Sequence, residues 1–275
     1  MKHPFTGRLR MAVAVAALLP LGTLSTAHAQ FSRPDDGWYV RLGTLGAIMP
    51  EYEGSDHAKF RILPDVEITY DDRFFLSREG LGVNVIARDG LTVGAAIGYD
   101  GGRKSSKDDA LTGFRSVGDT AVGRLFAQYQ IDRLMLSADV TTDLLGDGHG
   151  GTTATLGATY VFNPFGQTLL LAGPSVTWAS DDYMHSYYST TADRVRRPLP
   201  GDPVITGSRT GYQADAGFKD VGLTAIMIHP LDEHWSITGF AGYARLLNDA
   251  ADSPFVKDNG SRNQISGGLG LSYTF

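Results

Sequence analysis

The chain has no cysteine among its 275 residues. This absence excludes disulfides, thiolate metal sites, a cysteine nucleophile and a lipid-bearing cysteine. An excess of basic residues is also lacking, because 30 acidic residues outnumber 24 lysines and arginines and give a formal net charge of -6. A nucleic-acid-binding surface needs a basic stripe to neutralise phosphates, so we expect no nucleic-acid partner.

Long apolar runs are missing as well. The apolar stretch from Met11 to Leu21 is much shorter than the roughly 20 residues that a transmembrane helix needs. It follows a basic N-terminus and precedes Ala27-His28-Ala29, which has the small-x-small pattern of an export-signal cleavage site. We therefore predict a cleaved signal peptide over residues 1–29 and a single domain over residues 30–275. A membrane domain without a spanning helix must close its backbone hydrogen bonds as a barrel.

The last strand shows what kind of barrel this is. Every second residue from Ile265 to Phe275 is aliphatic, aromatic or glycine, whereas Gln264 and the residues between them are Gln, Ser, Gly and Thr. One face can meet lipid and the other a polar interior, as in a transmembrane barrel strand. The pattern Leu271, Tyr273 and Phe275 also resembles the C-terminal signal that the bacterial barrel-assembly machinery recognises. We therefore expect outer-membrane lipid and this machinery among the partners of the chain.

The same alternation recurs along the chain, and short polar breaks alternate with long ones. Short breaks such as Asp71-Asp72-Arg73 are expected to be periplasmic turns, and long ones such as residues 180–210 are expected to be outer loops. Alternating segments are expected to begin near Trp38, Phe60, Leu91, Thr120, Leu134, Thr152, Thr168, Gln213, Trp235 and Gln264.

One further stretch decides the strand count. Residues 74–87 connect one periplasmic turn to another, so they should run up and back as a short hairpin folded at Glu79-Gly80. The alternative, one long strand, would need a compensating break elsewhere, because both chain ends should be periplasmic and the strand number even. The sequence thus predicts an all-β fold, a transmembrane antiparallel up-and-down β-barrel of twelve strands with short periplasmic turns and longer outer loops.

Charged residues of both signs fall on the polar faces of these strands. Opposed charges can pair and plug the interior, or can line a polar path for small solutes. No ring of one sign stands out as a selectivity filter. The charged residues expected to face the lumen are Arg41, Arg61, Asp65, Glu67, Arg124, Arg133, Asp139 and Asp143.

Catalytic and metal-binding patterns were sought in the predicted loops. His149 and the His185-Ser186 pair are candidates for hydrolase chemistry, but adjacency in sequence does not place a base on a nucleophile, and a solvated loop is the simpler interpretation. Asp108-Asp109 and Asp181-Asp182 are adjacent loop acids, more typical of a solvated edge than of a cation site. We therefore expect no catalytic residue, no metal site and no cofactor.

Several segments together resemble the MipA/OmpV family, the MltA-interacting protein family of outer-membrane proteins. The matching segments are Pro50–Asp56, Gly80–Asn84, Trp178 followed by Tyr183-Met184 and Tyr187-Tyr188, Asp252–Pro254 and Tyr273–Phe275. The resemblance implies an outer-membrane barrel, and the member that names the family is described as a scaffold joining a murein-degrading lytic transglycosylase to a murein synthase. Other members are described as antigens, osmotically regulated porin-like proteins or antibiotic-response proteins.

The resemblance therefore implies a non-enzymatic outer-membrane scaffold in cell-wall assembly, with a lytic transglycosylase and a murein synthase as partners. The alternative is a small-solute, porin-like channel. Short turns such as Asp71-Asp72-Arg73 offer little apolar area for a stable interface. Any partner contact should thus be weak or should recruit the N-terminal segment Gln30–Gly37 as an additional arm.

Overall fold

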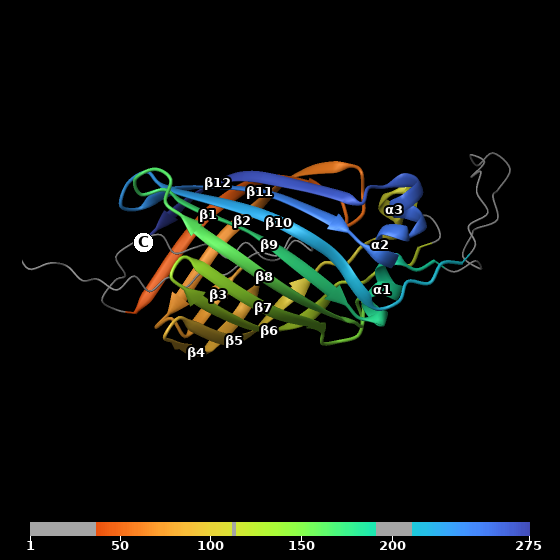
Figure 1. Cartoon of the computed structure of the whole chain (residues 1–275), viewed down its shortest axis with the longest axis horizontal. Helices are drawn as coiled ribbons and strands as arrows, with labels where there is room; N and C mark the ends of the chain where they lie inside the picture. The colour runs from red at the N-terminus through yellow and green to blue at the C-terminus, as the bar shows by residue number, and fades with distance from the viewer. Residues whose placement is uncertain (1–36, 112–113, 191–210) are drawn as a thin grey trace, which may run out of the picture.

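The computed structural model describes residues 37–111, 114–190 and 211–275, and these form one closed antiparallel barrel (Figure 1). Each strand pairs with its sequence neighbours, and the barrel closes where β1 pairs with β12. The prediction of a twelve-stranded up-and-down barrel is confirmed. The predicted signal peptide, residues 1–29, and the predicted mature start, Gln30, lie outside the described residues.

The strand bounds agree closely with the alternating segments of the sequence. The strands are β1 (Trp38–Pro50), β2 (Ala58–Tyr70), β3 (Phe74–Ser77), β4 (Gly80–Arg88), β5 (Leu91–Asp100), β6 (Thr120–Ile131), β7 (Leu134–Asp143), β8 (Thr152–Phe162), β9 (Leu169–Ala179), β10 (Gly217–Pro230), β11 (Trp235–Leu246) and β12 (Asn263–Thr274). The largest difference is at β10, which was expected to begin near Gln213. Residues before Gly217 instead bond to loops, since the N–H groups of Ala214 and Asp215 donate to the side chains of Ser189 and Asp249.

The stretch 74–87 is a short hairpin, as predicted. Ser77 of β3 faces Gly80 of β4 across the turn. Gly80 has φ +116°, and any side chain there would collide with the backbone of Ile97 in β5. Glycine therefore lets the hairpin tip lie against β5, and this brings Glu79 into the barrel.

The two faces of the strands separate by burial as the alternation requires. On β12, Ile265 and Leu269 are exposed, whereas Ser266 and Ser272 are buried inside. The exposed apolar belt ends in aromatic contacts at the turn end, where Tyr273 packs against Trp235 and Phe275 with ring centroids 5.0 and 4.8 Å apart. Outward apolar side chains and a terminal aromatic girdle are what lipid contact demands.

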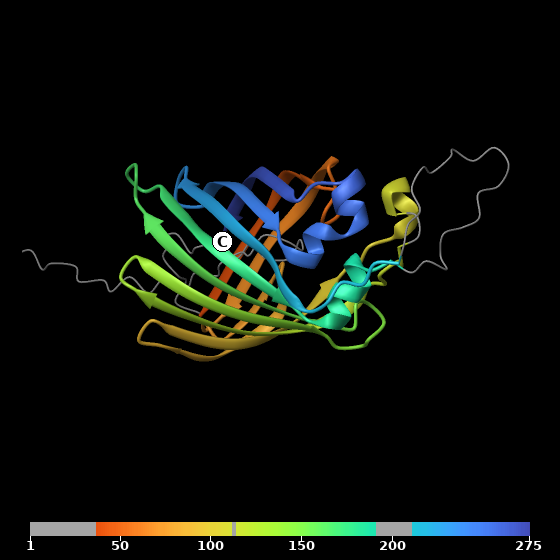
Figure 2. The same cartoon turned by 45° about the vertical axis from the view of Figure 1, so that its right-hand side comes forward.

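The two ends of the barrel differ, and we call them the turn end and the cap end. Tight turns at the turn end place aspartates at positive φ, including Asp72, Asp89 and Asp132. The cap end carries the long connections, which contain α1 (Asp181–Tyr188), α2 (Asn248–Asp252), α3 (Pro254–Asn259) and the 3-10 turns η1 (Ser105–Lys107) and η2 (Asp109–Leu111). Figure 2 shows the helices gathered over this end of the barrel. No helix in the described ranges is long and apolar enough to cross a membrane.

Candidate functional site

A first group of paired charges lies on β1 and β2, inside the barrel. Arg41 is 4% exposed, and its guanidinium donates to Glu67 at 2.8 Å and to Asp65 at 3.3 Å. Ser272 of β12 donates to the other oxygen of Asp65 at 2.8 Å. Arg41 lies directly opposite Glu67 in the strand register, so the pairing follows from the fold itself.

A second group joins β6, β7 and the β3–β4 hairpin. Arg124 forms ion pairs with Asp139 of β7 and with Glu79 at the hairpin tip, and all three side chains are largely buried. Sequence reasoning placed Arg124 and Asp139 in the lumen but missed Glu79, because a turn residue has no strand face. The signal that could have found it is the shortness of this hairpin, because β3 has only four residues.

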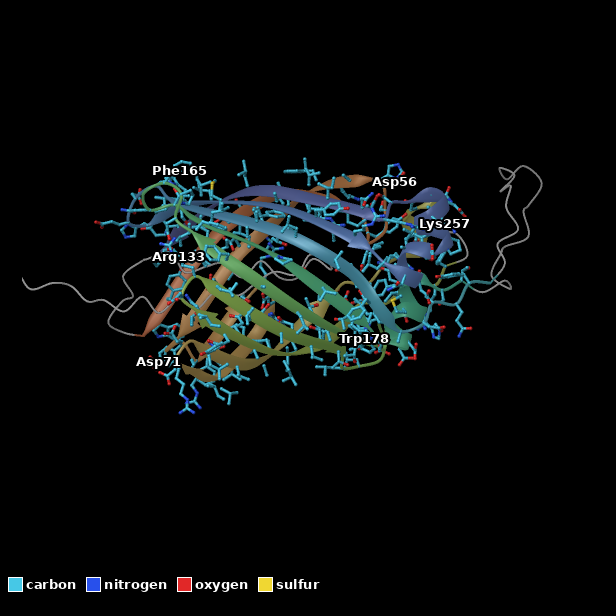
Figure 3. All side chains as sticks on the ribbon, in the orientation of Figure 1. Asp56, Asp71, Arg133, Phe165, Trp178 and Lys257 are labelled. Carbon is cyan, nitrogen blue, oxygen red and sulfur yellow. The ribbon has the colours of Figure 1, made fainter. Side chains whose placement is uncertain are left out.

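The other residues expected in the lumen lie nearer the barrel rims. Arg61 donates to the carbonyl oxygen of Glu51 at 2.8 Å. Asp143 accepts from the hydroxyl of Thr120 at 2.6 Å and from backbone N–H groups of the connection that follows it, so it holds an outer loop. Arg133 differs from the expectation, because β7 begins only at Leu134 and Arg133 is exposed in the preceding turn (Figure 3).

Part of the interior is apolar, which the sequence did not predict. Buried apolar side chains from β1 and from β7 to β11 form one packed cluster, which we call the inner core: Leu45, Ala47, Met49, Met135, Val161, Leu169, Leu171, Ile226, Ile228 and Phe240. None of them is more than 9% exposed. Packed apolar side chains of this kind differ from the polar lining of a water-filled barrel. The inner core shares the described interior with the two ion-pair groups and with buried polar side chains such as Thr159, Thr238 and Ser266.

A second apolar cluster, which we call the aromatic cap, covers the cap end. It consists of Leu111, Phe114, Val117, Ala179, Tyr183, Met184, Tyr187, Tyr188, Ala214, Leu246, Ala250, Ala251, Phe255 and Val256. Tyr183 and Tyr188 are only 1% and 0% exposed, so the tyrosines of the longest loop pack rather than form an open surface. Burial raises the pKa of both hydroxyls well above its ordinary value, so these tyrosines remain protonated.

Buried ions lie directly beneath the aromatic cap. Lys219 is completely buried and pairs with Glu53 and Asp220. A register shift in β10 between Phe218 and Asp220 allows adjacent residues to be buried together. The hydroxyl of Tyr183 donates to the second oxygen of Glu53 at 3.4 Å. The cap is thus tied to the first outer loop by a charge network that no spacing in the sequence reveals.

The histidines of the cap are held by neighbours other than a nucleophile. The Nδ1 atom of His149 accepts from the N–H of Gly151 at 3.0 Å, and Nε2 lies 3.8 Å from Asp100. Ser186 donates to the backbone carbonyl of His149 at 2.8 Å, not to its ring. The ring of His185 lies 3.1 Å from the amide of Gln213. In the described ranges, no group of acids and histidines could hold a metal ion.

His149 should make the cap sensitive to acid. Burial lowers the pKa of His149 in the folded protein, although Asp100 and Asp143 oppose the shift. The folded state therefore binds the proton more weakly than the unfolded chain, whose histidine pKa is about 6.5. The folded state therefore has its full stability above pH 6.5, where His149 is neutral in both states, and loses stability as the pH falls through and below that value. His149→Gln should flatten the fall in Tm between about pH 7 and pH 5.

The matched control is His57→Gln, because His57 is 74% exposed on another outer loop. Its pH profile should follow that of the wild type in thermal unfolding of the detergent-solubilised barrel. Equal profiles for His149→Gln and the wild type would show that His149 does not link the cap to pH.

A closed barrel with a lipid-facing apolar surface, an aromatic belt and short turns at one end defines an integral β-barrel protein of the outer membrane. The chain belongs to the family described as "MltA-interacting protein MipA", whose family model matches residues 42–275. It is also 26% identical over 174 residues to the outer membrane protein OmpV of Vibrio cholerae, an alignment that covers 63% of this chain and 56% of OmpV. The aligned part thus spans little more than half of that relative.

Solved outer-membrane proteins show weaker likeness. A FadL homologue from Pseudomonas aeruginosa is 11% identical with a TM-score of 0.38, covering 87% of this chain and 90% of its own. OmpT of Vibrio cholerae is 10% identical with a TM-score of 0.37, covering 90% of this chain and 100% of its own.

Proposed function

We propose that this chain is a non-enzymatic outer-membrane scaffold that brings a lytic transglycosylase and a murein synthase together at its periplasmic end. The observation that carries the proposal is the family match over residues 42–275, because that family is described by its interaction with MltA. The inner core supports it, since apolar side chains packed inside the barrel oppose a polar path for solutes. Two acids of the lumen, Glu67 and Asp139, are likewise held in ion pairs with Arg41 and Arg124.

The proposal also covers the export of the chain and its assembly into the outer membrane. Residues 1–29 act as the export signal and residues 30–275 form the mature domain. Leu271, Tyr273 and Phe275 are the residues through which the barrel-assembly machinery recognises the last strand. Leu271 and Phe275 are 44% and 63% exposed, so both are open to a partner or to lipid.

The contact surface is the turn end, on two adjacent turns. Phe165, in the connection from β8 to β9, is 76% exposed, and Leu231, after β10, is 52% exposed. The two turns are neighbours because Leu169 pairs with Ile228. The sequence led us to expect little apolar area on the short turns, and these two exposed side chains modify that expectation. Two anchors are still few against the roughly 1,200 to 2,000 Å2 of a stable interface, so the contact is weak or includes residues 30–37.

A pull-down tests this surface. The double variant Phe165→Ser with Leu231→Ser should lose the lytic transglycosylase from solubilised envelopes, because it removes both anchors. Leu145→Ser is the matched control, since Leu145 is 64% exposed in the connection after β7 at the cap end. It should recover the enzyme as the wild type does.

A channel is the competing function, and a conductance measurement on the same purified protein distinguishes it from the scaffold. The wild-type barrel in a planar bilayer should show no stable conductance, because the inner core packs inside the barrel and the aromatic cap covers its cap end. Steady conductance, together with failure to recover any murein enzyme, would replace the scaffold by a small-solute channel.

A further inference from the structure

Arg103 is a buried cation whose side chain has no hydrogen-bond acceptor among the described residues. It lies in the connection between β5 and β6 and is 5% exposed. All three guanidinium nitrogens are buried and have no hydrogen-bond partner in the part of the chain that the structure describes. Its backbone is fixed, because Arg103 and Val117 exchange N–H to O hydrogen bonds of 3.0 and 2.8 Å. The backbone of Arg103 is therefore held in place, while its side-chain donors have no acceptor among the described residues.

Aromatic rings surround this guanidinium. Its central carbon lies 5.1 Å from the ring centroid of Phe255, 5.4 Å from Tyr187 and 5.9 Å from Phe114. These rings come from three different outer connections. We call Arg103 with these three rings the arginine box. Several outer loops of the barrel therefore converge on one charge.

The rings do not explain the open donors. A cation above a ring face gains about 0.5 to 2 kcal/mol, but the five N–H groups of a guanidinium point outward in its own plane and need acceptors there. A buried donor without an acceptor costs about 1 to 3 kcal/mol. Burial also lowers the pKa of Arg103, so the surroundings disfavour its charge. An anion in the guanidinium plane would accept hydrogen bonds from these donors and would also favour the charged form of Arg103.

The nearby acids are already engaged. Glu53 is paired with Lys219, and Asp108 accepts from the hydroxyl of Tyr52 at 2.8 Å. These carboxylates make a doubly charged anion such as phosphate unfavourable beside Arg103. A carboxylate carries one charge and matches the fork of the guanidinium with two parallel hydrogen bonds. The rings of Phe114 and Phe255 beside the guanidinium favour a carboxylate that carries an apolar body.

We propose that the arginine box is a binding site for a small organic monocarboxylate with an apolar or aromatic body, held by Arg103. The site faces the outer side of the barrel, at the opposite end from the proposed scaffold surface, and it does not depend on the scaffold role. The ligand binds by paired hydrogen bonds to the guanidinium while its body contacts the rings. Because the box joins several outer connections, a bound carboxylate also stabilises the cap.

Calorimetry and thermal shift with benzoate test the site on the full-length detergent-solubilised barrel. Benzoate at millimolar concentration should bind the wild type and raise its Tm, while phosphate and benzylamine should do neither. Arg103→Met should lower benzoate affinity by about tenfold or more. Arg115→Met is the matched control, because Arg115 is exposed in the same connection, and it should bind as the wild type does.

The Tm of the variants without ligand shows whether Arg103 serves a binding site or only holds the loops together. Arg103→Met should leave the ligand-free Tm unchanged or raised, because it removes a buried charge that lacks an anion. If Arg103 served only to hold the loops together, this Tm would fall. Should Arg103→Met fail to fold, Arg103→Lys keeps the charge, loses the fork and should still bind benzoate more weakly. Absence of benzoate binding by the wild type, or equal binding of benzoate and phosphate, would overturn the proposal.

Discussion

Replacing Arg124 with methionine should lower the free energy of unfolding by about 3 to 5 kcal/mol. Arg124 is 7% exposed and is the cation that pairs with Glu79 and Asp139. Methionine fills a similar volume, so the main loss is charge, and two buried carboxylates would remain near each other without a counterion. The cost of a buried charge that has lost its partner exceeds what the pair itself contributes. Guanidinium titration of the barrel refolded in lipid vesicles, followed by tryptophan fluorescence, measures the change.

Two variants make this test specific. Arg133→Met changes the same residue type in the exposed turn between β6 and β7, and it should cost less than about 0.5 kcal/mol. Adding Glu79→Gln and Asp139→Asn to Arg124→Met removes the uncompensated charges and should restore most of the stability. A small effect of Arg124→Met alone would show that water or another group reaches the acids and that this interior group is not sealed.

Much of the barrel followed from period-two alternation, which is a local property of the chain. Residues such as Leu134 and Trp235 begin strands as expected, because a lipid face and an inner face impose opposite polarities on neighbours. The hairpin in residues 74–87 followed from topology: an even strand number leaves it no other path. Charges such as Arg41 and Glu67 lie on adjacent strands whose turn sets the register, so their pairing was within reach of sequence.

What the sequence did not predict depends on contacts between distant segments. Leu169 and Ile228 pack inside the barrel, yet other aliphatic side chains of these strands, such as Leu223, lie on the lipid face, so polarity alone could not assign them. The aromatic cap joins α1, α3 and the connection around Phe114, which are brought together only by barrel closure. Arg103 gave no signal for the same reason, because its rings come from separate loops.

Placing arginine at Leu156 should destabilise the barrel by about 2 to 4 kcal/mol, because the substitution puts a charge on the lipid face near the bilayer midplane. Leu156 lies in the middle of β8 and is 59% exposed, while its neighbour Thr155 faces inward and bonds Thr177 across the register. Leu145→Arg is the matched control, because Leu145 is 64% exposed but lies in an outer loop. There the same change should cost about 0 to 1 kcal/mol.

The two variants carry the same substitution at different depths, so the difference between their free energies of unfolding reports the effect of membrane depth. Both replace an exposed leucine by arginine, and neither removes a hydrogen bond or an ion pair found in the described residues. Guanidinium titration in vesicles of defined lipid gives both free energies on one scale. Thinner bilayers should reduce the cost at Leu156 and leave that at Leu145 unchanged, since a shorter hydrocarbon core lets the guanidinium reach the headgroups. Equal costs at the two positions would mean that β8 does not cross the membrane with Leu156 toward lipid.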